Sequence, residues 1–259
     1  MFQKNILSEL IKISYEAGII IMDFYNNKFE VKYKTDSSPV TNADKNAEEF
    51  ILKKLNIIFP DIPIISEEAY SKKIIPKYDK KFFLVDPLDG TKEFIKKNGE
   101  FTVNIAYIEE GITKIGFINA PAKNEIFFND GKKSYLIKTN LKNEVQFKKA
   151  QQIRVSDERD RNLIATMSRS HKGKEIENYL KNYDISKIKD IGSSYKFCLI
   201  ASGKAHIYPR MAPTCEWDTA AGHAILKMAG GNVTLLNGEE LRYGFKENNF
   251  INPNFIARN

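Results

Sequence analysis

Carboxylate side chains recur at the predicted ends of structural elements in this 259-residue chain: Asp44, Glu67, Glu68, Asp86, Asp89 and Asp218. Groups at such ends are held by a rigid strand or helix, while the adjoining loop leaves room for a ligand. Carboxylates that come close together repel one another unless a cation lies between them. The set contains no histidine or cysteine, so its oxygen ligands favour Mg²⁺ over Zn²⁺. The pattern predicts a site for a hard divalent cation.

The most specific of these motifs is DPLDGT, residues 86–91. Pro87 has no N–H group, so we expect the preceding strand to end there and the turn to direct both aspartates and the Leu88 carbonyl toward one point. Gly90 would let the backbone approach a phosphate, whose oxygens the N–H groups of Gly90 and Thr91 would bind if they begin a helix. Taken alone, the motif is equally compatible with an exposed turn.

Each of the other acidic fragments has a simpler explanation when taken alone. Glu67 and Glu68 form a pair of the kind that is usually solvated, and Asp218 is typical of a helix N-cap. The segment from Thr41 to Asp44 resembles a capping box with Asp in the Glu position. All four fragments in one chain, each at the end of an element, favour a shared site.

The elements that would position these groups follow from the spacing of apolar residues. Apolar residues recur at helical spacing over about residues 6–25 and again between Thr41 and Pro60, which predicts two amphipathic helices. Residues 101–137 alternate as an antiparallel meander does, and a lysine-rich stretch over 138–152 marks a boundary. Further strands are predicted over residues 62–65, 82–85, 163–167 and 206–208, and further helices over 172–183, 194–201 and 217–228.

Charge and composition narrow the class of protein. The chain has 40 Lys and Arg against 33 Asp and Glu, and its net charge of +7 favours anionic ligands. The lysine pairs are scattered, whereas a nucleic-acid-binding face would gather them near a recognisable motif. Two cysteines without metal or disulfide spacing suit a reducing compartment. The N-terminal segment has no uncharged secretory core, and we expect a soluble protein.

Four motifs resemble those of the inositol monophosphatase superfamily of Mg²⁺-dependent, lithium-sensitive phosphatases: TNAD at 41–44, SEE at 66–68, DPLDGTKEF at 86–94 and EWDTAAG at 216–222. The likeness covers nearly the whole chain. Four further segments resemble the bacterial 3'(2'),5'-bisphosphate nucleotidases of sulfate assimilation: GEFTVNIA at 99–106, SRSH at 168–171, IGSSYKFC at 191–198 and YPR at 208–210. The departure from the family pattern at Cys215-Glu216, just before Trp217-Asp218, is flanking and leaves every implied ligand in place.

The resemblance implies an α/β (α+β) fold, a layered αβαβα sandwich in which residues 1–259 form one phosphatase unit of two packed halves. Residues 1–140 would carry the metal-binding motifs, and residues 150–259 the nucleotide pocket and the last metal ligand. The implied catalytic residues are Asp44, Glu67 and Thr91. The implied ligands of two or three Mg²⁺ ions are Glu67, Asp86, Leu88, Asp89 and Asp218. The implied substrate-binding residues are Glu67, Leu88, Asp89, Gly90, Thr91, Ser168, His171, Gly192, Ser193, Lys196, Arg210 and Asp218.

The implied reaction is hydrolysis of the 3'-phosphate of adenosine 3',5'-bisphosphate to AMP and phosphate by a metal-activated water, with 3'-phosphoadenylyl sulfate as a second substrate. Two alternatives stay open. An inositol monophosphatase or fructose-1,6-bisphosphatase would share the metal core, and a basic nucleic-acid-binding module would carry an incidental acidic cluster. The implied partner is a small nucleotide bisphosphate and no nucleic acid. A monomer or homodimer in the cytoplasm is expected, without a membrane span but with peripheral inner-membrane association left open.

Overall fold

The computed structural model describes residues 4–34, 38–140, 145, 147–169 and 173–259. Its largest sheet has the strand order β3-β4-β5-β6-β7-β8-β9, and only the β3–β4 pair in it is parallel over the described residues. The pairing of these strands therefore confirms the predicted antiparallel meander. The strands of this large sheet are β3 (Ile64–Ser66), β4 (Lys81–Asp89), β5 (Thr102–Glu109), β6 (Ile112–Ala120), β7 (Glu125–Asn129), β8 (Ser134–Lys138) and β9 (Gln151–Ile153).

A smaller sheet is built from the second half of the chain in the order β11-β10-β12-β14-β13. Strand β10 pairs in parallel with β11 and β12, whereas β14 pairs antiparallel with β12 and β13. Its strands are β10 (Leu163–Ser168), β11 (Ile185–Ile191), β12 (Ile207–Arg210), β13 (Asn232–Leu235) and β14 (Phe255–Arg258). The N-terminal hairpin consists of β1 (Val31–Tyr33) and β2 (Pro39–Thr41).

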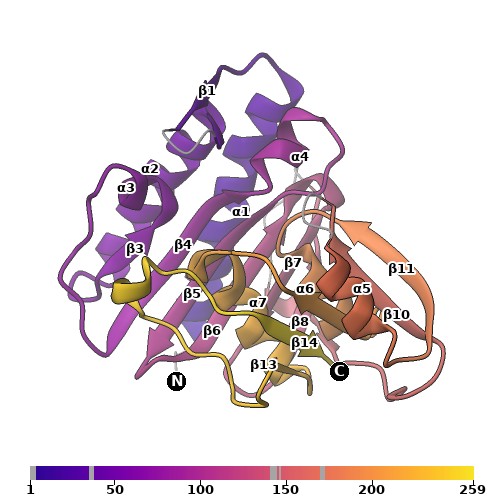
Figure 1. Cartoon of the computed structure of the whole chain (residues 1–259). Helices are drawn as coiled ribbons and strands as arrows, with labels where there is room; N and C mark the ends of the chain where they lie inside the picture. The colour runs from indigo at the N-terminus through magenta and orange to yellow at the C-terminus, as the bar shows by residue number, and fades with distance from the viewer. Residues whose placement is uncertain (1–3, 35–37, 141–144, 146, 170–172) are drawn as a thin grey trace.

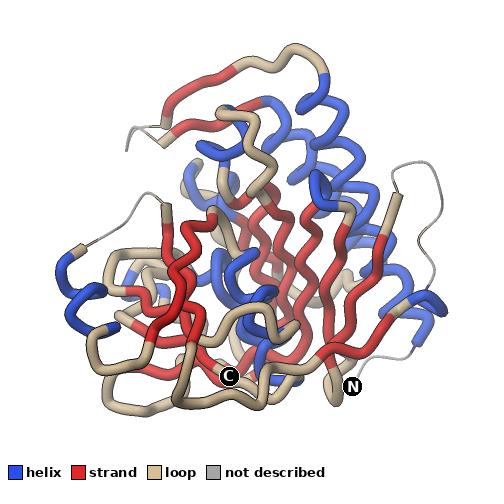
Figure 2. The backbone as a smooth tube through the Cα atoms, turned by 90° about the vertical axis from the view of Figure 1, so that its right-hand side faces the viewer, coloured by secondary structure: helices blue, strands red, loops and turns tan. Residues whose placement is uncertain are grey.

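The helices form layers on both sides of the two sheets (Figure 1). Helices α1 (Lys4–Asn26) and α2 (Asn42–Ile58) cover one face of the large sheet, and Figure 2 shows them on the side opposite the smaller sheet. Helices α6 (Tyr195–Ala201) and α7 (Glu216–Met228) lie between the sheets, and α5 (Lys174–Leu180) packs on the outer face of the smaller one. The layers confirm the predicted αβαβα sandwich. None of the described helices is long and apolar enough to cross a membrane.

Alternation within the strands of the large sheet supplies two separate cores. Successive side chains of a strand point to opposite faces. On β4, Phe83 and Val85 therefore pack with α1 and α2, whereas Phe82 and Leu84 pack with α6, α7 and the smaller sheet. All four side chains are at most 2% exposed. Because both faces are covered, residues 82–85 of β4 appear in the sequence as a continuous apolar run.

The remaining elements are short and lie at the edges of these layers. Helix α3 (Glu67–Ser71) follows β3 directly, and α4 (Thr91–Ile95) follows β4 after Gly90. Three 3₁₀ turns complete the described elements: η1 (Pro121–Lys123), η2 (Phe147–Lys149) and η3 (Lys246–Asn248). Both α3 and α4 thus begin where a strand of the large sheet ends.

One local expectation was wrong. Strand β4 does not end at Pro87 but continues to Asp89, which pairs with Thr102 of β5. The register shifts between Asp86 and Asp89, which is a bulge in the ladder. A bulge leaves residues out of the ladder, so the N–H group that proline lacks is not needed there. The bulge keeps both aspartates at the same end of the sheet.

A glycine on β6 brings α7 close to the large sheet. A Cβ atom at Gly116 would lie 2.3 Å from the carbonyl oxygen of Ala221, so no larger residue fits without moving the helix. Helix α7 begins at Glu216, and its first turn contains Asp218. The close approach of α7 therefore places Asp218 beside the end of β4.

Candidate active site

The end of β4 carries the first group of predicted ligands. Asp86 and Leu88 are each 1% exposed, and the backbone N–H of Leu88 donates to Asp86 Oδ1 at 3.0 Å. This local hydrogen bond is an Asx turn, which Asp-Pro sequences favour. It turns the chain so that the Leu88 carbonyl oxygen lies 3.3 Å from Thr91 Oγ1. Asp86, Leu88 and Thr91 are thus brought together by the bulged end of one strand.

Asp89 is held from both halves of the chain. Its Oδ2 accepts a hydrogen bond from the backbone N–H of Ser194 at 2.5 Å and lies 3.4 Å from Asn104 Nδ2. The hydroxyl of Ser194 in turn lies 2.7 Å from Asn104 Oδ1 and 2.8 Å from Thr102 Oγ1. Asp89 therefore has a fixed orientation, set by β5 of the large sheet and by the segment that precedes α6.

The first turn of α2 brings Asp44 to the same place. Thr41 and Asp44 form the predicted capping box, in which Asp44 Oδ2 accepts from the Thr41 N–H at 2.8 Å and from its hydroxyl at 2.6 Å. The other oxygen, Oδ1, accepts from the Thr91 hydroxyl at 3.1 Å. Asp44 is only 2% exposed. The cap and the contact with Thr91 fix both carboxylate oxygens.

A lysine lies against the acidic pair that begins α3. Lys34 follows β1, and its Nζ lies 2.7 Å from Glu67 Oε1 and 2.6 Å from Glu68 Oε1. Burial by itself would lower the pKa of Lys34, but the charges of Glu67 and Glu68 outweigh it and raise that pKa. Glu68 is buried, whereas the Glu67 side chain keeps 30% of its surface exposed. Lys34 therefore acts as a counter-cation for both acids.

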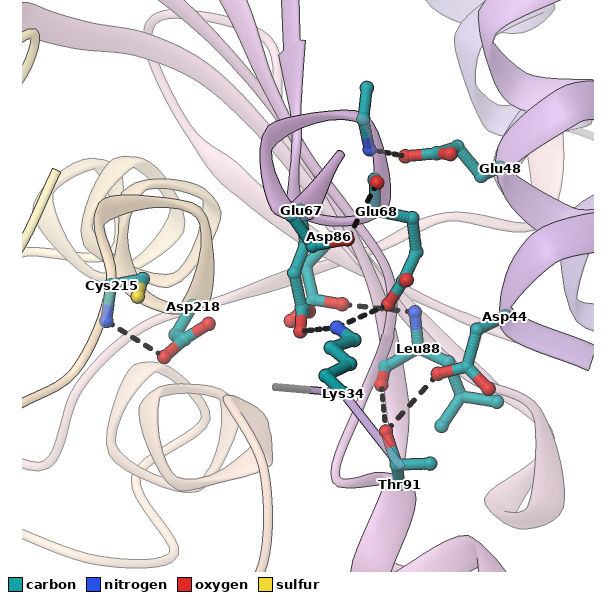
Figure 3. A network of polar contacts seen from close by, with 12 residues as sticks. Lys34, Asp44, Glu48, Glu67, Glu68, Asp86, Leu88, Thr91, Cys215 and Asp218 are labelled. Atoms are coloured by element: carbon teal, nitrogen blue, oxygen red, sulfur yellow. Dashed lines mark hydrogen bonds and ion pairs between the residues drawn. The ribbon is translucent and has the colours of Figure 1, made fainter. Parts of the chain in front are cut away.

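Asp218 approaches the same acids from α7 (Figure 3). Its Oδ2 accepts from the Cys215 N–H at 3.0 Å and from the Thr214 hydroxyl at 2.6 Å. In Figure 3 it lies on the side of Glu67 and Asp86 opposite Asp44 and Thr91. The predicted N-cap explanation is partly right, because Asp218 caps the helix from its first turn, but that role leaves its second oxygen facing the acids.

Burial, and after it the charge of neighbouring acids, raises the pKa of several of these carboxyl groups. Burial raises the pKa of both Asp44 and Asp89 to about 7, and the charge of Asp218 adds to the effect on Asp89. The pKa of Asp86 is raised well above its ordinary value, first by burial and then by the charges of Glu67 and Asp89. Like charges that raise one another's pKa are close enough to attract a shared cation.

The donor set fits a hard divalent cation. It consists of carboxylates and one carbonyl oxygen, the ligands that Mg²⁺ takes. The Lys34 ammonium already contacts one member of this set, Glu67, together with the neighbouring Glu68. Among the residues the structure describes, no three acidic, histidine or cysteine side chains stand close enough to enclose an ion without moving. The ligand roles of these residues thus stay predictions, to which the structure adds proximity, burial and mutual repulsion.

These pKa shifts predict how a cation changes stability with pH. An acid with a raised pKa in the folded state stabilises the fold fully below its unfolded pKa, and that stability is lost as pH rises through the folded pKa. For Asp44 and Asp89, this stability is lost as the pH rises from their ordinary pKa of 3.8 to their folded-state pKa of about 7. We expect thermal unfolding in EDTA to occur a few degrees lower at about pH 8 than at about pH 5.5, and Mg²⁺ to raise the midpoint more at the higher pH. Equal Mg²⁺ effects at both pH values would contradict this.

A pocket joins these acids to basic residues of the second half. Its lining includes ten of the predicted site residues: Glu67, Asp89, Gly90, Thr91, Ser168, Gly192, Ser193, Lys196, Arg210 and Asp218. Predicted residue His171 lies outside the described residues. Lys196 is 4% exposed, and its Nζ donates to the Ser193 carbonyl at 2.5 Å and the Ile191 carbonyl at 3.2 Å. Burial lowers the pKa of Lys196 to about 8, against the opposing charge of Asp89.

Arg210 ends β12 on the same wall of the pocket. Its Nε donates to the Ala212 carbonyl at 2.8 Å, and its second guanidinium nitrogen donates to the Pro213 carbonyl at 2.6 Å. These bonds fix the loop before α7 and hold the guanidinium in place. Acidic and basic walls thus face one pocket, which is an arrangement for a molecule that carries phosphates.

Known proteins share both the sequence and the fold of this chain. A profile of the inositol monophosphatase family matches residues 3–258, nearly the whole length. The chain belongs to the inositol monophosphatase family. Within that family, a 3'(2'),5'-bisphosphate nucleotidase CysQ of Buchnera aphidicola is 43% identical over 98% of this chain and 94% of its own. The 3'(2'),5'-bisphosphate nucleotidase CysQ of Salmonella typhimurium is 40% identical over 96% of this chain and 98% of its own.

Solved structures of the family superpose on this one. The crystal structure of CysQ from Bacteroides thetaiotaomicron has a TM-score of 0.81 and 38% identity, and the alignment covers 99% of this chain and 97% of that one. A Thermotoga maritima inositol monophosphatase (IMPase) has a TM-score of 0.79 and 26% identity, with 98% and 92% covered. CysQ and an inositol monophosphatase thus share this fold. The fold therefore does not distinguish the two activities, and the residues of the pocket have to be compared.

Among the residues that contact the predicted ligands, Lys34 and Asn104 were not expected from the sequence. Lys34 has no signal in the sequence, because a single lysine in a short hairpin is ordinarily solvated. Asn104 does have one, since it is a polar residue inside the apolar run of β5, and it is 0% exposed. A buried polar side chain needs a partner, and Asn104 finds Asp89 and Ser194.

Proposed function

We propose that this chain is a Mg²⁺-dependent phosphatase that hydrolyses the 3'-phosphate of adenosine 3',5'-bisphosphate to AMP and phosphate, and that 3'-phosphoadenylyl sulfate is a second substrate. The observation that carries the proposal is the single pocket in which buried acids face Lys196 and Arg210. A monophosphate needs only the acidic wall and its cations, whereas a substrate with two phosphates also needs the basic wall. The names of the CysQ relatives support the same substrate class.

In this proposal Glu67, Asp86, the Leu88 carbonyl, Asp89 and Asp218 hold two or three Mg²⁺ ions. The chemistry that Mg²⁺ supplies when bound is a lowered pKa of a water ligand and neutralisation of charge on the phosphate. The chain itself contributes the orientation of the ligands: Ser194 and Asn104 fix Asp89, and Thr214 and Cys215 fix Asp218.

Asp44 and Thr91 would handle the proton of the attacking water. The Thr91 hydroxyl lies 3.1 Å from Asp44 Oδ1 and 3.3 Å from the Leu88 carbonyl oxygen. A water bound to this hydroxyl would therefore lie near both Asp44 and the Leu88 carbonyl. Burial raises the pKa of Asp44 to about 7, which suits a general base that works near neutral pH. Asp44 Oδ1 then accepts the proton while the capping box holds Oδ2.

We further propose that the halves 1–140 and 150–259 act as one unit, because the pocket takes residues from both. The carboxylate of Asp89 in the first half already accepts a hydrogen bond from the Ser194 N–H of the second half. The first half would bind the reacting phosphate, and the second half would bind the other phosphate and the nucleoside. Neither half carries a complete site by itself.

One experiment tests the function directly. Phosphate release is measured from nucleotide bisphosphates, inositol phosphates and sugar phosphates, each with Mg²⁺ and with EDTA. We expect preferred release from adenosine 3',5'-bisphosphate and none in EDTA. A preference for inositol monophosphate or fructose 1,6-bisphosphate would assign the other activity of the family. Salt-dependent binding of polynucleotides without phosphate release would favour the nucleic-acid-binding alternative.

The basic wall gives a prediction of its own. Lys196→Met should raise KM for adenosine 3',5'-bisphosphate roughly tenfold to a hundredfold, because a buried charge that faces a phosphate is lost. KM for adenosine 3'-monophosphate should change little. Lys187→Met, at an exposed position on β11, serves as the control. Equal effects of Lys196→Met on the two substrates would remove the assignment of the basic wall.

A further inference from the structure

Glu100 lies where the two halves of the pocket meet. It follows α4 and precedes β5 in the first half, and its side chain reaches two residues of the second half. Its Oε2 accepts from the Gly192 N–H at 2.8 Å. An Arg169 guanidinium nitrogen lies 2.9 Å from Oε1 and 2.8 Å from Oε2, and the same nitrogen is 2.8 Å from the Asp190 carbonyl. One carboxylate thus joins the ends of β10 and β11.

The ends of these strands form one wall of the pocket. Strands β10 and β11 are parallel, and Ser168 pairs with Ile191 at their carboxyl ends. Ser168 and Gly192 line the pocket, and Arg169 follows Ser168 directly. Because Glu100 contacts Arg169 and Gly192 together, it fixes both strand ends relative to the first half.

The backbone of Glu100 makes a second contact with both walls. A Cβ atom added at Gly90 would lie 3.0 Å from the Glu100 carbonyl oxygen, and one added at Gly192 would lie 2.8 Å from it. Both glycines therefore pack against the same carbonyl. Gly90 belongs to the turn beside the acids, and Gly192 to the segment before α6. Residue 100 is the point at which these two walls of the pocket touch.

The Gly192 segment in turn orients Lys196. The flanking carbonyls of Ile191 and Ser193 accept the hydrogen bonds of Lys196 Nζ. Ser193 has a φ of 53°, a left-handed conformation that residues with a side chain seldom adopt. Such a conformation persists only where its surroundings impose it. The Glu100 bond to the Gly192 N–H on one side and the Asp89 bond to the Ser194 N–H on the other impose it here.

The two contacts of Glu100 differ in how exposed they are to solvent, and therefore in strength. The Arg169 side chain is 42% exposed and the Glu100 side chain 13%. An ion pair with an exposed partner contributes little, because solvent screens it. A charge-assisted hydrogen bond from a part-buried backbone N–H contributes more, since losing it leaves the N–H unsatisfied. The bond to Gly192 is therefore the contact that matters for the pocket.

We propose that Glu100 is a positioning residue for the second phosphate: through Gly192 it holds the carbonyls that orient the Lys196 ammonium toward the pocket. This inference rests on the proposed function and refines its substrate specificity. Glu100 itself does not touch the substrate. Its loss should weaken recognition of the second phosphate and leave the reaction at the acids nearly unchanged.

The test compares KM and kcat for adenosine 3',5'-bisphosphate and adenosine 3'-monophosphate. Glu100→Ala should raise KM for the bisphosphate about tenfold, with a small change in kcat and in both constants for the monophosphate. Glu100→Gln keeps an acceptor for the Gly192 N–H, so its KM should return close to that of the wild type. In the Lys196→Met background, Glu100→Ala should add little, because the two residues act on one interaction.

Glu109→Ala is the matched control. Glu109 ends β5 outside this pocket, and its Oε1 lies 3.0 Å from Lys81 Nζ on β4. Equal loss for both substrates, or an additive effect with Lys196→Met, would overturn the inference. If Glu100→Ala does not fold, Glu100→Asp, which keeps the charge but draws the oxygen back from Gly192, should show the same selective rise in KM. A wild-type protein without bisphosphatase activity would instead overturn the proposed function itself.

Discussion

Asp89→Asn should lower the turnover of adenosine 3',5'-bisphosphate by roughly a thousandfold, the factor that corresponds to several kcal/mol of lost charge stabilisation. The substitution replaces a charged oxygen ligand by a neutral amide of the same size. The amide oxygen can still accept from the Ser194 N–H, which holds Asp89 now. The loss should therefore come from cation binding and not from a displaced side chain.

Thermal unfolding with and without Mg²⁺ distinguishes these causes. In EDTA, Asp89→Asn should unfold at or above the temperature of the wild type, because one of the mutually repelling charges around Asp86 and Asp218 is gone. The rise of the midpoint with Mg²⁺ should shrink. Asp130→Asn is the control, since Asp130 accepts from the Lys132 and Lys133 N–H groups in an exposed turn that an amide can also support. Turnover like that of the wild type would remove Asp89 from the ligand set.

Asp44→Asn should lower kcat by about a hundredfold to ten-thousandfold, which is the usual contribution of a general base. Asparagine can accept from the Thr41 N–H, as Asp44 does now, so α2 should keep its cap. It cannot take a proton from water near neutral pH. The rate of the wild type should fall as pH drops and Asp44 becomes protonated. This acid limb should be smaller in the variant, which keeps only the part caused by protonation of ligands such as Asp89.

The control for Asp44 is a change in the same cap. Thr41→Ser keeps the hydroxyl that donates to Asp44 Oδ2 but alters its packing. It should leave kcat within a few-fold of the wild type and retain the acid limb of the pH profile. If Asp44→Asn retained both the rate and the pH profile, another group would have to accept the proton.

Local patterns in the sequence predicted much of the fold. The first helix, the Thr41 capping box and the antiparallel meander were confirmed, because helix spacing, caps and strand alternation depend on neighbouring residues. The end of β4 was predicted wrongly at Pro87, because a bulge is a property of two paired strands. Strand β11 was not predicted, since its isoleucines at 185, 188 and 191 are three residues apart instead of two and it lies at the edge of its sheet. The roles of the site residues stay predictions.

The residue types at the site were determined by the sequence alone. Acids at element ends, the Asx turn after Asp86 and the glycines at 90 and 192 belong to short segments whose chemistry can be stated without a fold. The tertiary structure alone decided which of these groups meet. Ser194 binds Asp89 across 105 positions, Glu100 binds Gly192 across 92, and Lys34 reaches Glu67 across 33. The first two contacts depend on how the two sheets stack around α6 and α7, and the third on where the N-terminal hairpin packs; no local interaction encodes either arrangement.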